Sequence, residues 1–306
     1  MIDLLNNEHK LQKQIRPRNV FTAFILSVIL PGFGQIYNGE LKKGILLFAL
    51  YLLNPLLFGF SRATTHFYGF AFLILTQLFI LIYIIVDAVK DAKRQRFYMP
   101  KTYNSWYYQL SIAVGMFLAF WAYDAKLILG ILAFHIPTPS NLPTIEVGDR
   151  IIADMEAYKK ASPNYGDIVV FRRQGDQIYS FRIVGLPNDT LEIVDNILII
   201  NGKKSKSTFI KDTIVDPFEV REFEEEFPNG QKHLIYKLKQ PFDTASSNVT
   251  NIIVPDNSYY LMGDNRDNAA DSRYEGVVKK DKIIGRIIYS YWGHSAHRIN
   301  LDFRNN

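Results

Sequence analysis

The side chains that could do chemistry lie in four segments in the second half of the chain. These segments are residues 135–145, 165–171, 181–189 and 262–273, and the last of them reads MGDNRDNAADSR. Ser140 follows Thr138 and Pro139 and is a candidate nucleophile, although a serine flanked by prolines is also typical of a rigid turn. Because a serine hydroxyl is a weak nucleophile, catalysis at Ser140 would require a neighbouring base.

The order and spacing of the four segments resemble those of the bacterial type I signal peptidases over about residues 134–306. The resemblance implies a serine endopeptidase without a cofactor, which removes signal peptides from exported proteins at the outer face of the cytoplasmic membrane. It implies that Ser140 is the nucleophile and that Thr138 helps to stabilise the oxyanion. The supporting residues that it implies are Asp264, Arg266, Asp271, Ser272 and Arg273.

Three positions depart from the pattern of that family. Phe181 occupies the place of the lysine base, Ala269 that of the serine that orients this lysine, and Asn141 that of the methionine after the nucleophile. A lysine serves as a base only when burial lowers its pKa from about 10.4 towards neutrality, and its neutral amine then needs a hydrogen-bond partner. If the lysine alone were lost, the serine that orients it would keep a buried hydroxyl without a hydrogen-bond partner, which costs about 1–3 kcal/mol. The paired change therefore predicts a site repacked as apolar.

The residues near Ser140 in sequence offer no evident replacement for the missing base. Arg182 directly follows Phe181, but a guanidinium does not deprotonate in proteins. His135 lies five residues before Ser140, which is a long reach along an extended chain. The sequence therefore predicts weak activation of Ser140.

Three functions fit this combination of residues. The first is a signal peptidase-like endopeptidase, in which the loss of the base costs at least about 10²–10⁴-fold in rate. The second is a catalytically inactive relative that acts as a membrane-bound peptide-binding or assembly protein, in which an extended peptide can add to an open strand edge. The third places the main role in the N-terminal helices, with the second half as an accessory.

The four segments belong to a region of short β-branched runs separated by turn residues, which predicts an antiparallel β-rich domain over residues 135–306. The expected strands are Arg150–Ala153, Ile168–Phe171, Tyr179–Val184, Thr190–Ile193, Ile197–Ile200, His233–Leu238, Tyr259–Met262 and Ile283–Tyr289. Residues 203–250 are more polar and are interpreted as an insertion. Its acidic run, Glu222, Glu224, Glu225 and Glu226, is expected to form a solvated face.

The N-terminal region, residues 1–107, is predicted to be a membrane region, because a crossing helix needs about 20 mostly apolar residues. The predicted segments are a re-entrant or interfacial stretch at 20–36, helices at 44–60 and 68–88, a basic cytoplasmic loop at 89–107, and a membrane helix at 108–134 that leads into the β-rich domain. Within the last segment, residues 127–134 are expected to run on as an interfacial or buried strand.

Two clusters of basic residues predict the orientation in the membrane. They are Lys10, Lys13, Arg16 and Arg18, and then Lys90, Lys93, Arg94, Arg96 and Lys101. Positive loops stay in the cytoplasm, so an even number of crossings should separate the clusters. The next crossing carries the β-rich domain outward, which predicts a multi-pass protein of the cytoplasmic membrane with an extracytoplasmic C-terminal domain. The resemblance implies that this domain meets the lipid bilayer and exported pre-proteins.

The composition excludes several other classes of site. The chain of 306 residues has no cysteine, which excludes disulfides, zinc–thiolate sites and a cysteine nucleophile. The formal net charge of +5 is mild, and much of the positive charge flanks the apolar segments. Because no basic stripe interleaved with aromatic residues is present, nucleic-acid binding is not expected. The polar first 18 residues do not match a cleavable secretory signal.

Overall fold

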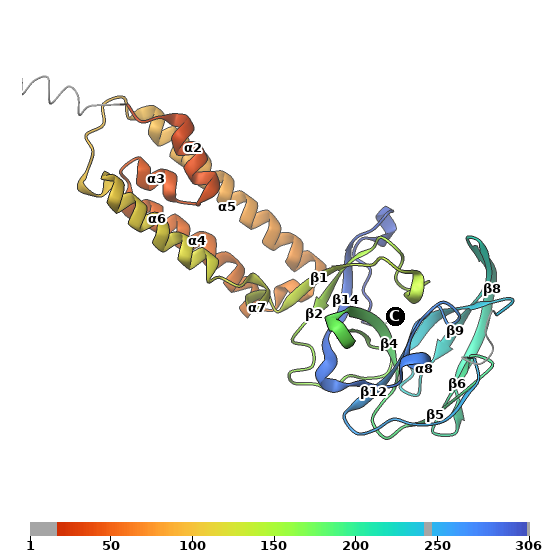
Figure 1. Cartoon of the computed structure of the whole chain (residues 1–306). Helices are drawn as coiled ribbons and strands as arrows, with labels where there is room; N and C mark the ends of the chain where they lie inside the picture. Colours follow the sequence, from red (N-terminus) through yellow and green to blue (C-terminus); the bar gives the residue numbers. More distant parts are fainter. Residues whose placement is uncertain (1–16, 242–246, 305–306) are drawn as a thin grey trace, which may run out of the picture. The chain divides into compact units, whose positions relative to one another are not determined.

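The computed structural model describes residues 17–241 and 247–304 and divides the chain into two compact units, Met1–Leu129 and Gly130–Asn306 (Figure 1). The first unit is helical, and the second is built mainly from β-strands. Lys10, Lys13 and Arg16 of the expected N-terminal basic cluster lie outside the described residues.

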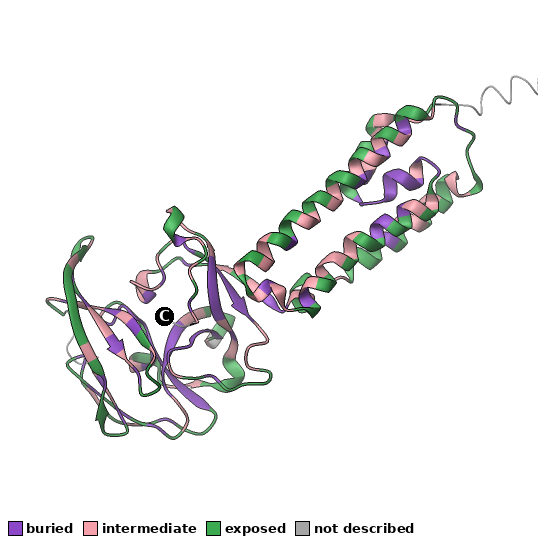
Figure 2. Ribbon diagram, turned by 180° about the vertical axis from the view of Figure 1, so that it is seen from behind, coloured by how far each residue is buried: buried purple, intermediate pink, exposed green. Residues whose placement is uncertain are grey.

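Among its described residues, the helical unit contains two helices, α4 and α5, that are long and apolar enough to cross a membrane by length and composition. Its elements are α2 (Val20–Ile29), α3 (Phe33–Tyr37), α4 (Leu41–Phe60), η1 (Ala63–Thr65), α5 (Phe67–Arg94), η2 (Thr102–Asn104), α6 (Trp106–Trp121) and α7 (Ala125–Leu129). Exposed residues run along the whole length of α4 and α5 (Figure 2), and many of them are large and apolar, such as Phe60 and Phe79. This distribution fits helices surrounded by lipid.

The polar residues inside α4 and α5 bond to one another. Asn54 Nδ2 donates to Gln77 Oε1 at 2.9 Å and to Thr76 Oγ1 at 3.1 Å, and Gln77 Nε2 donates to the Tyr51 carbonyl oxygen at 3.2 Å. Asn54 precedes Pro55, which lies inside the helix and cannot donate a backbone hydrogen bond. These contacts satisfy the polar groups of the two apolar helices and fasten α4 to α5.

The stretch at 20–36 forms two short helices with a tight turn between them. At Gly32 in that turn φ is +91°, and a Cβ atom there would stand 2.3 Å from the Gly44 carbonyl oxygen, so only glycine fits. Gln35 Nε2 donates to the Ile84 carbonyl oxygen at 2.7 Å, which ties α3 to α5. The ten residues of α2 are about half of what a crossing needs, and the re-entrant or interfacial placement stays a prediction.

The predicted end of the second long helix is wrong. The helix expected over 68–88 continues as α5 to Arg94, so the first part of the expected basic loop at 89–107 is helical. Lys43 on α4 pairs with Asp87 at 2.7 Å and with Asp91 at 2.9 Å, and this pairing stabilises the extra turns.

The membrane helix expected over 108–134 is also wrong in its extent. Helix α6 ends at Trp121, and Asp124 Oδ1 then accepts backbone hydrogen bonds from Lys126 and Leu127 to start the short helix α7. Gly130 follows with φ of +64°, and the chain continues as strand β1. The expectation of a strand near the end of this segment agrees with β1, whereas α6 alone has only 16 residues.

The second unit confirms the predicted antiparallel β-rich fold, since every strand pairing is antiparallel. Its strands are β1 (Ile131–His135), β2 (Arg150–Asp154), β3 (Ile168–Arg172), β4 (Ile178–Gly185), β5 (Thr190–Val194), β6 (Ile197–Ile200), β7 (Lys203–Lys204), β8 (Lys206–Val215), β9 (Phe218–Glu226), β10 (Lys232–Leu238), β11 (Val249–Ile253), β12 (Ser258–Met262), β13 (Val278–Lys279) and β14 (Ile283–Trp292). A seven-stranded sheet has the order β1-β2-β14-β3-β4-β12-β13, and smaller sheets have the orders β10-β9-β8 and β11-β5-β6-β7.

The acidic run in the expected insertion does not form a solvated face. Residues 203–250 contribute the whole β10-β9-β8 sheet, and the run lies on its middle strand, β9. Glu225 is fully buried and Glu222 is 6% exposed. The prediction for this run is wrong because a middle strand has neighbours on both sides, and because Glu225 has a buried cationic partner, Arg266.

The core of the β-rich unit brings together the segments that carry the candidate chemistry. One apolar cluster includes Ile136, Ile151 and Val170, and a second includes Phe181 and Ala269. Residues 263–271, which we call the signature loop, connect β12 to the short helix α8 (Ser272–Glu275). This loop and strands β1 to β4 position the candidate site.

Candidate active site around Ser140

Ser140 lies in η3 (Pro139–Asn141), a single 3-10 turn between β1 and β2. The signature loop holds this turn from one side, because the backbone N–H of Asn265 donates to the Ser140 carbonyl oxygen at 3.1 Å. The side-chain amide of Asn265 donates to the Pro139 carbonyl oxygen, also at 3.1 Å. On β4, the Ser180 carbonyl oxygen accepts from Asn141 Nδ2 at 2.9 Å, so the turn is fixed from two sides.

Ser140 faces a cleft of about 580 Å³. The lining residues are Phe134, His135, Ile136, Pro137, Thr138, Ser140, Ile151, Val170, Gln177, Ile178, Tyr179, Ser180, Phe181 and Ala270. Most of this surface is apolar, and the volume lies within the range of about 300–1,000 Å³ that is usual for ligand-binding clefts. Thr138 is exposed at the cleft two residues before Ser140. The arrangement suits an extended apolar peptide that passes the Ser140 hydroxyl.

The place predicted for a base holds a buried aromatic ring. Phe181 is 3% exposed, and its ring centroid lies 5.9 Å from that of Phe171. Ala269 belongs to the same apolar cluster. A Cβ atom added at Gly263 would stand 2.4 Å from Ala269 Cβ, 2.5 Å from the Ser140 carbonyl oxygen and 3.5 Å from Phe181 Cδ1. Phe181, Ala269 and Ser140 therefore converge on Gly263.

The cleft offers few groups that could accept a proton from Ser140. Among the described residues that line it, only His135 and Tyr179 have titratable side chains. A tyrosine phenol is a poor proton acceptor, whereas a neutral imidazole can serve as a base. His135 ends β1 and is exposed.

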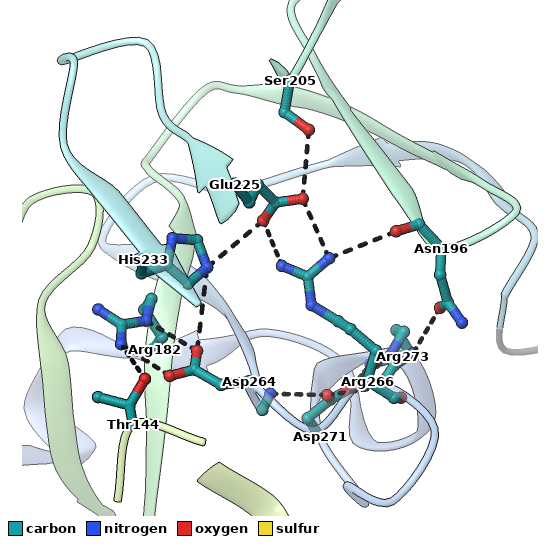
Figure 3. A network of polar contacts seen from close by, with 11 residues as sticks. Thr144, Arg182, Asn196, Ser205, Glu225, His233, Asp264, Arg266, Asp271 and Arg273 are labelled. Carbon is teal, nitrogen blue, oxygen red and sulfur yellow. Dashed lines mark hydrogen bonds and ion pairs between the residues drawn. The ribbon is translucent and has the colours of Figure 1, made fainter. Parts of the chain in front are cut away.

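The signature loop is anchored by buried ion pairs (Figure 3). Arg182 is fully buried and forms a two-pronged contact with Asp264, with Nε–Oδ1 at 2.8 Å and Nη2–Oδ2 at 2.7 Å. Arg182 Nη2 also donates to Thr144 Oγ1 at 3.2 Å, which ties the loop to the segment after Ser140. Such planar pairs fix orientation as well as position. Arg182 therefore has a structural role beside the cleft.

The end of the signature loop is fixed by a second pair. Asp271 and Arg273 form an ion pair at 2.9 Å, and both side chains are fully buried. Asp271 Oδ2 also accepts from the Gly263 N–H at 2.9 Å, which closes the loop on itself. Ser272 Oγ accepts from the Leu261 N–H at 3.0 Å and joins the loop to β12. These contacts fit the supporting role predicted for this group.

The β10-β9-β8 sheet supplies a third anchor. Glu225 on β9 pairs with Arg266 through both carboxylate oxygens, and Ser205 Oγ donates to Glu225 Oε1 at 3.2 Å. His233 on β10 lies between the two ion pairs, 3.5 Å from Glu225 Oε2 and 3.9 Å from Asp264 Oδ1 (Figure 3). Burial, followed by the charges of Arg182 and Arg266, lowers the pKa of His233 well below its usual range.

The sequence model of the family described as "Signal peptidase, peptidase S26" matches residues 104–292, which contain all four predicted segments. The chain belongs to this family. The match begins after α2 to α5, so these four helices lie outside the part of the chain that the family model covers. The resemblance predicted from the sequence is confirmed.

Two named signal peptidases agree with the match. Signal peptidase IB of Staphylococcus aureus strain MRSA252 is 26% identical over 187 residues, which cover 59% of this chain and 91% of the relative. Signal peptidase I of Rickettsia typhi strain Wilmington is 31% identical over 203 residues, which cover 55% and 77%. The crystal structure of a signal peptidase I from Enterococcus faecalis V583 aligns with 24% identity and a TM-score of 0.25, covering 41% of this chain and 96% of that one.

The structure brings the predicted residues Thr138, Ser140 and Phe181 to one cleft, with Ala269 in the apolar packing behind it. The five predicted supporting residues lie in and just after the signature loop. Sequence reasoning missed Asn265, which fixes the Ser140 turn, and Glu225, which pairs with Arg266. The Glu225–Arg266 pair joins residues 41 positions apart, and the acidic run contained no sign of which glutamate would be buried.

Proposed function

We propose that the chain binds signal peptides of exported proteins in the Ser140 cleft and acts on them as a serine endopeptidase of low turnover. The observation that carries this proposal is the position of Ser140 on a doubly fastened turn at an apolar cleft, in a member of the signal peptidase family. In this proposal Ser140 is the nucleophile and Thr138 helps to stabilise the oxyanion. Donors aimed at developing charge are worth about 3–4 kcal/mol in a transition state.

Low turnover follows from the surroundings of Phe181. A buried phenyl ring accepts no proton, and Arg182 beside it is committed to Asp264. Removing a general base typically slows a reaction about 10²–10⁴-fold. His135 is the remaining cleft residue with a side chain of suitable basicity and would supply a slow route.

A second candidate is a peptide-binding protein without turnover. The tight packing of Phe181 with Ala269 favours it, since both members of the family's Lys–Ser pair are replaced by apolar residues that contact one cluster. The cleft and the anchors of the signature loop would serve binding alone equally well.

In either case we propose that the β-rich unit lies on the outer face of the cytoplasmic membrane. A signal peptide emerges from the lipid there, so a cleft that follows directly on a membrane segment can meet it. The apolar helices α4 and α5 support attachment to the membrane.

A cleavage assay separates the two candidates. Purified full-length protein in detergent is given a pre-protein with small residues at positions −3 and −1. We expect cleavage about 10²–10⁴-fold slower than that by a family member with the lysine base. Ser140→Ala should abolish this cleavage while signal-peptide binding remains, and His135→Ala should reduce it further if the imidazole is the base.

The outcomes of this assay are distinct. Binding without any cleavage would favour the second candidate. Cleavage that persists in Ser140→Ala would overturn the role of Ser140. An absence of both binding and cleavage would overturn the proposal as a whole.

A further inference from the structure

A second pocket adjoins the Ser140 cleft and is lined by basic side chains. Its volume is about 560 Å³, and it shares the lining residues Gln177 and Tyr179 with the cleft. The charged residues of this basic pocket are Arg172, Arg173, Glu275, Lys279 and Lys282. Four basic groups against one acidic group leave an excess of positive charge beside an otherwise apolar cleft.

Arg173 is fixed against the wall that the two pockets share. Its guanidinium carbon lies 4.2 Å from the ring centroid of Tyr179 and 5.6 Å from that of Phe181, and its Nη2 donates to the Ala270 carbonyl oxygen. The Arg173 side chain is only 16% exposed, and its carboxylate neighbour, Glu275, lies 3.8 Å away and is 58% exposed. Stacking on Tyr179 fixes the Arg173 side chain, while its ion-pair contact with Glu275 is long and solvent-exposed. A carboxylate ligand could therefore bind Arg173 with little further loss of side-chain conformational entropy.

The other cations of the basic pocket are also available. Within the described part of the chain, Lys279 and Lys282 have no carboxylate within ion-pair distance, and both are exposed. Arg172 pairs with Asp176 at 3.4 Å, but both side chains are largely solvated. Exposed pairs of this kind contribute about 0–1 kcal/mol, so a better-placed anion can displace them.

On the basis of the proposed function, we propose that the basic pocket binds an acidic side chain of the polypeptide whose adjacent residues occupy the Ser140 cleft. The shared wall of Gln177 and Tyr179 lets one extended chain reach both pockets, because each extended residue advances about 3.3 Å. The planar fork of Arg173 matches a carboxylate. An anionic bilayer surface would meet the exposed lysines first and would leave this largely buried guanidinium without a ligand.

The test compares labelled peptides that share an apolar signal-peptide core with small residues at −3 and −1. In each peptide one Glu occupies a different position on either side of these residues, and a matched peptide has Gln there. Kd is measured by fluorescence anisotropy with the full-length protein in neutral detergent. At one position or at neighbouring positions, we expect the Kd of the Glu peptide to be about fivefold lower than that of the Gln peptide. This difference in Kd should become smaller at high salt.

The matched variants locate this preference. Lys279→Gln with Lys282→Gln should reduce the Glu preference at least about twofold, because Arg173 remains, and should leave the Kd of the Gln peptide unchanged. Lys280→Gln is the control, because Lys280 lies between them in sequence but does not line the basic pocket.

Equal Kd values for Glu and Gln at every position would overturn this inference and leave the proposed function intact. Failure of every peptide to bind would overturn the proposed function itself. If the Lys279→Gln, Lys282→Gln variant keeps its Glu preference but loses binding to phosphatidylglycerol vesicles, the basic pocket would be a lipid-binding site and the acidic-peptide site would be refuted.

Discussion

In the proposed function, the reactivity of Ser140 depends on two apolar residues, Phe181 and Ala269. Both side chains belong to one apolar cluster and approach Gly263 beside the Ser140 carbonyl, at the positions where the sequence resemblance predicts an amine and its hydroxyl partner. We predict that Phe181→Lys combined with Ala269→Ser raises the rate of signal-peptide cleavage at least about tenfold, because a buried lysine with a hydrogen-bond partner has a pKa low enough to act as a base. Initial rates on the same pre-protein measure this effect.

The single change Phe181→Lys is the informative control for this pair. Without the Ala269→Ser hydroxyl, the amine is buried with no partner, so we expect a lower melting temperature and a smaller gain in rate than in the double variant. If the double variant melts like the parent and still cleaves no faster, further parts of the site would have diverged from the family.

His233 makes the stability of the β-rich unit depend on pH. Its folded-state pKa lies well below its usual value, while in the unfolded chain it titrates near 6.5. Below about pH 6.5 the unfolded state therefore binds one more proton, and stability falls as pH falls, by at most about 1.4 kcal/mol per pH unit. We predict that His233→Gln flattens this slope in melting curves between pH 7 and 5, whereas the exposed His297→Gln leaves it unchanged.

The sequence predicted the residues of the cleft better than the contacts that hold them. Ser140, Thr138 and Phe181 were found because their spacing matches a family motif, which depends on residue type and order alone. Glu225 was misplaced because burial of a carboxylate depends on a cation far along the chain, in this case Arg266. Asn265 lay inside the motif, but its role depends on the Ser140 carbonyl oxygen, whose direction only the folded turn determines.

Among the secondary-structure elements, β9 and β10 are the part of residues 203–250 that contacts the signature loop. The Tyr236 N–H donates to the Asp264 carbonyl oxygen and the Arg266 N–H to the Tyr236 carbonyl oxygen, both at 2.9 Å, so β10 runs alongside the loop. Glu225 completes this junction through its buried pair with Arg266. The region interpreted as an insertion therefore supports the Ser140 turn, two hydrogen-bonded steps away.

We predict that Glu225→Ala destabilises the β-rich unit by about 3–5 kcal/mol, because it leaves the buried Arg266 charge without its partner. Glu224→Ala is the matched control on the same strand, since Glu224 is half-exposed and pairs with the exposed Lys232, and we expect a change within about 0.5 kcal/mol. Urea unfolding in detergent measures both. Similar losses in the two variants would show that the strand, and not the buried pair, is sensitive.

The elements themselves were predictable to different degrees. Short β-branched runs bounded by turn residues located eight strands, because β-branched side chains pack well on a pleated sheet. Strand β8 was missed since its side chains are mostly exposed and polar, so its partner β9 and not its own pattern determines it. The change from helix to strand near the end of 108–134 was expected, but the short helix α7 was missed because it depends on the Asp124 side chain, which caps it, and on Gly130, which ends it.

For the whole molecule, the family match begins after α5 but before the boundary between the two units. The match covers residues 104–292 and the unit boundary follows Leu129, so α6 and α7 belong to the family region and also to the helical unit that contains α2–α5. A cleft that acts on signal peptides must lie where they leave the lipid. The orientation of the β-rich unit is therefore the property on which the proposed function depends most directly.

We predict that a reporter fused after Asn306 reads as extracytoplasmic and that one fused after Arg96 reads as cytoplasmic. The basic residues at the end of α5 should remain in the cytoplasm, and one further crossing then carries the β-rich unit outward.

Helix α6 has 16 residues and spans about 24 Å at 1.5 Å per residue, somewhat less than the hydrocarbon thickness of about 30 Å. The apolar residues of α7 would have to complete the crossing. Paired alkaline phosphatase and green fluorescent protein fusions measure both sites, and a cytoplasmic signal from the Asn306 fusion would refute the orientation and, with it, the meeting of cleft and signal peptide at the outer face.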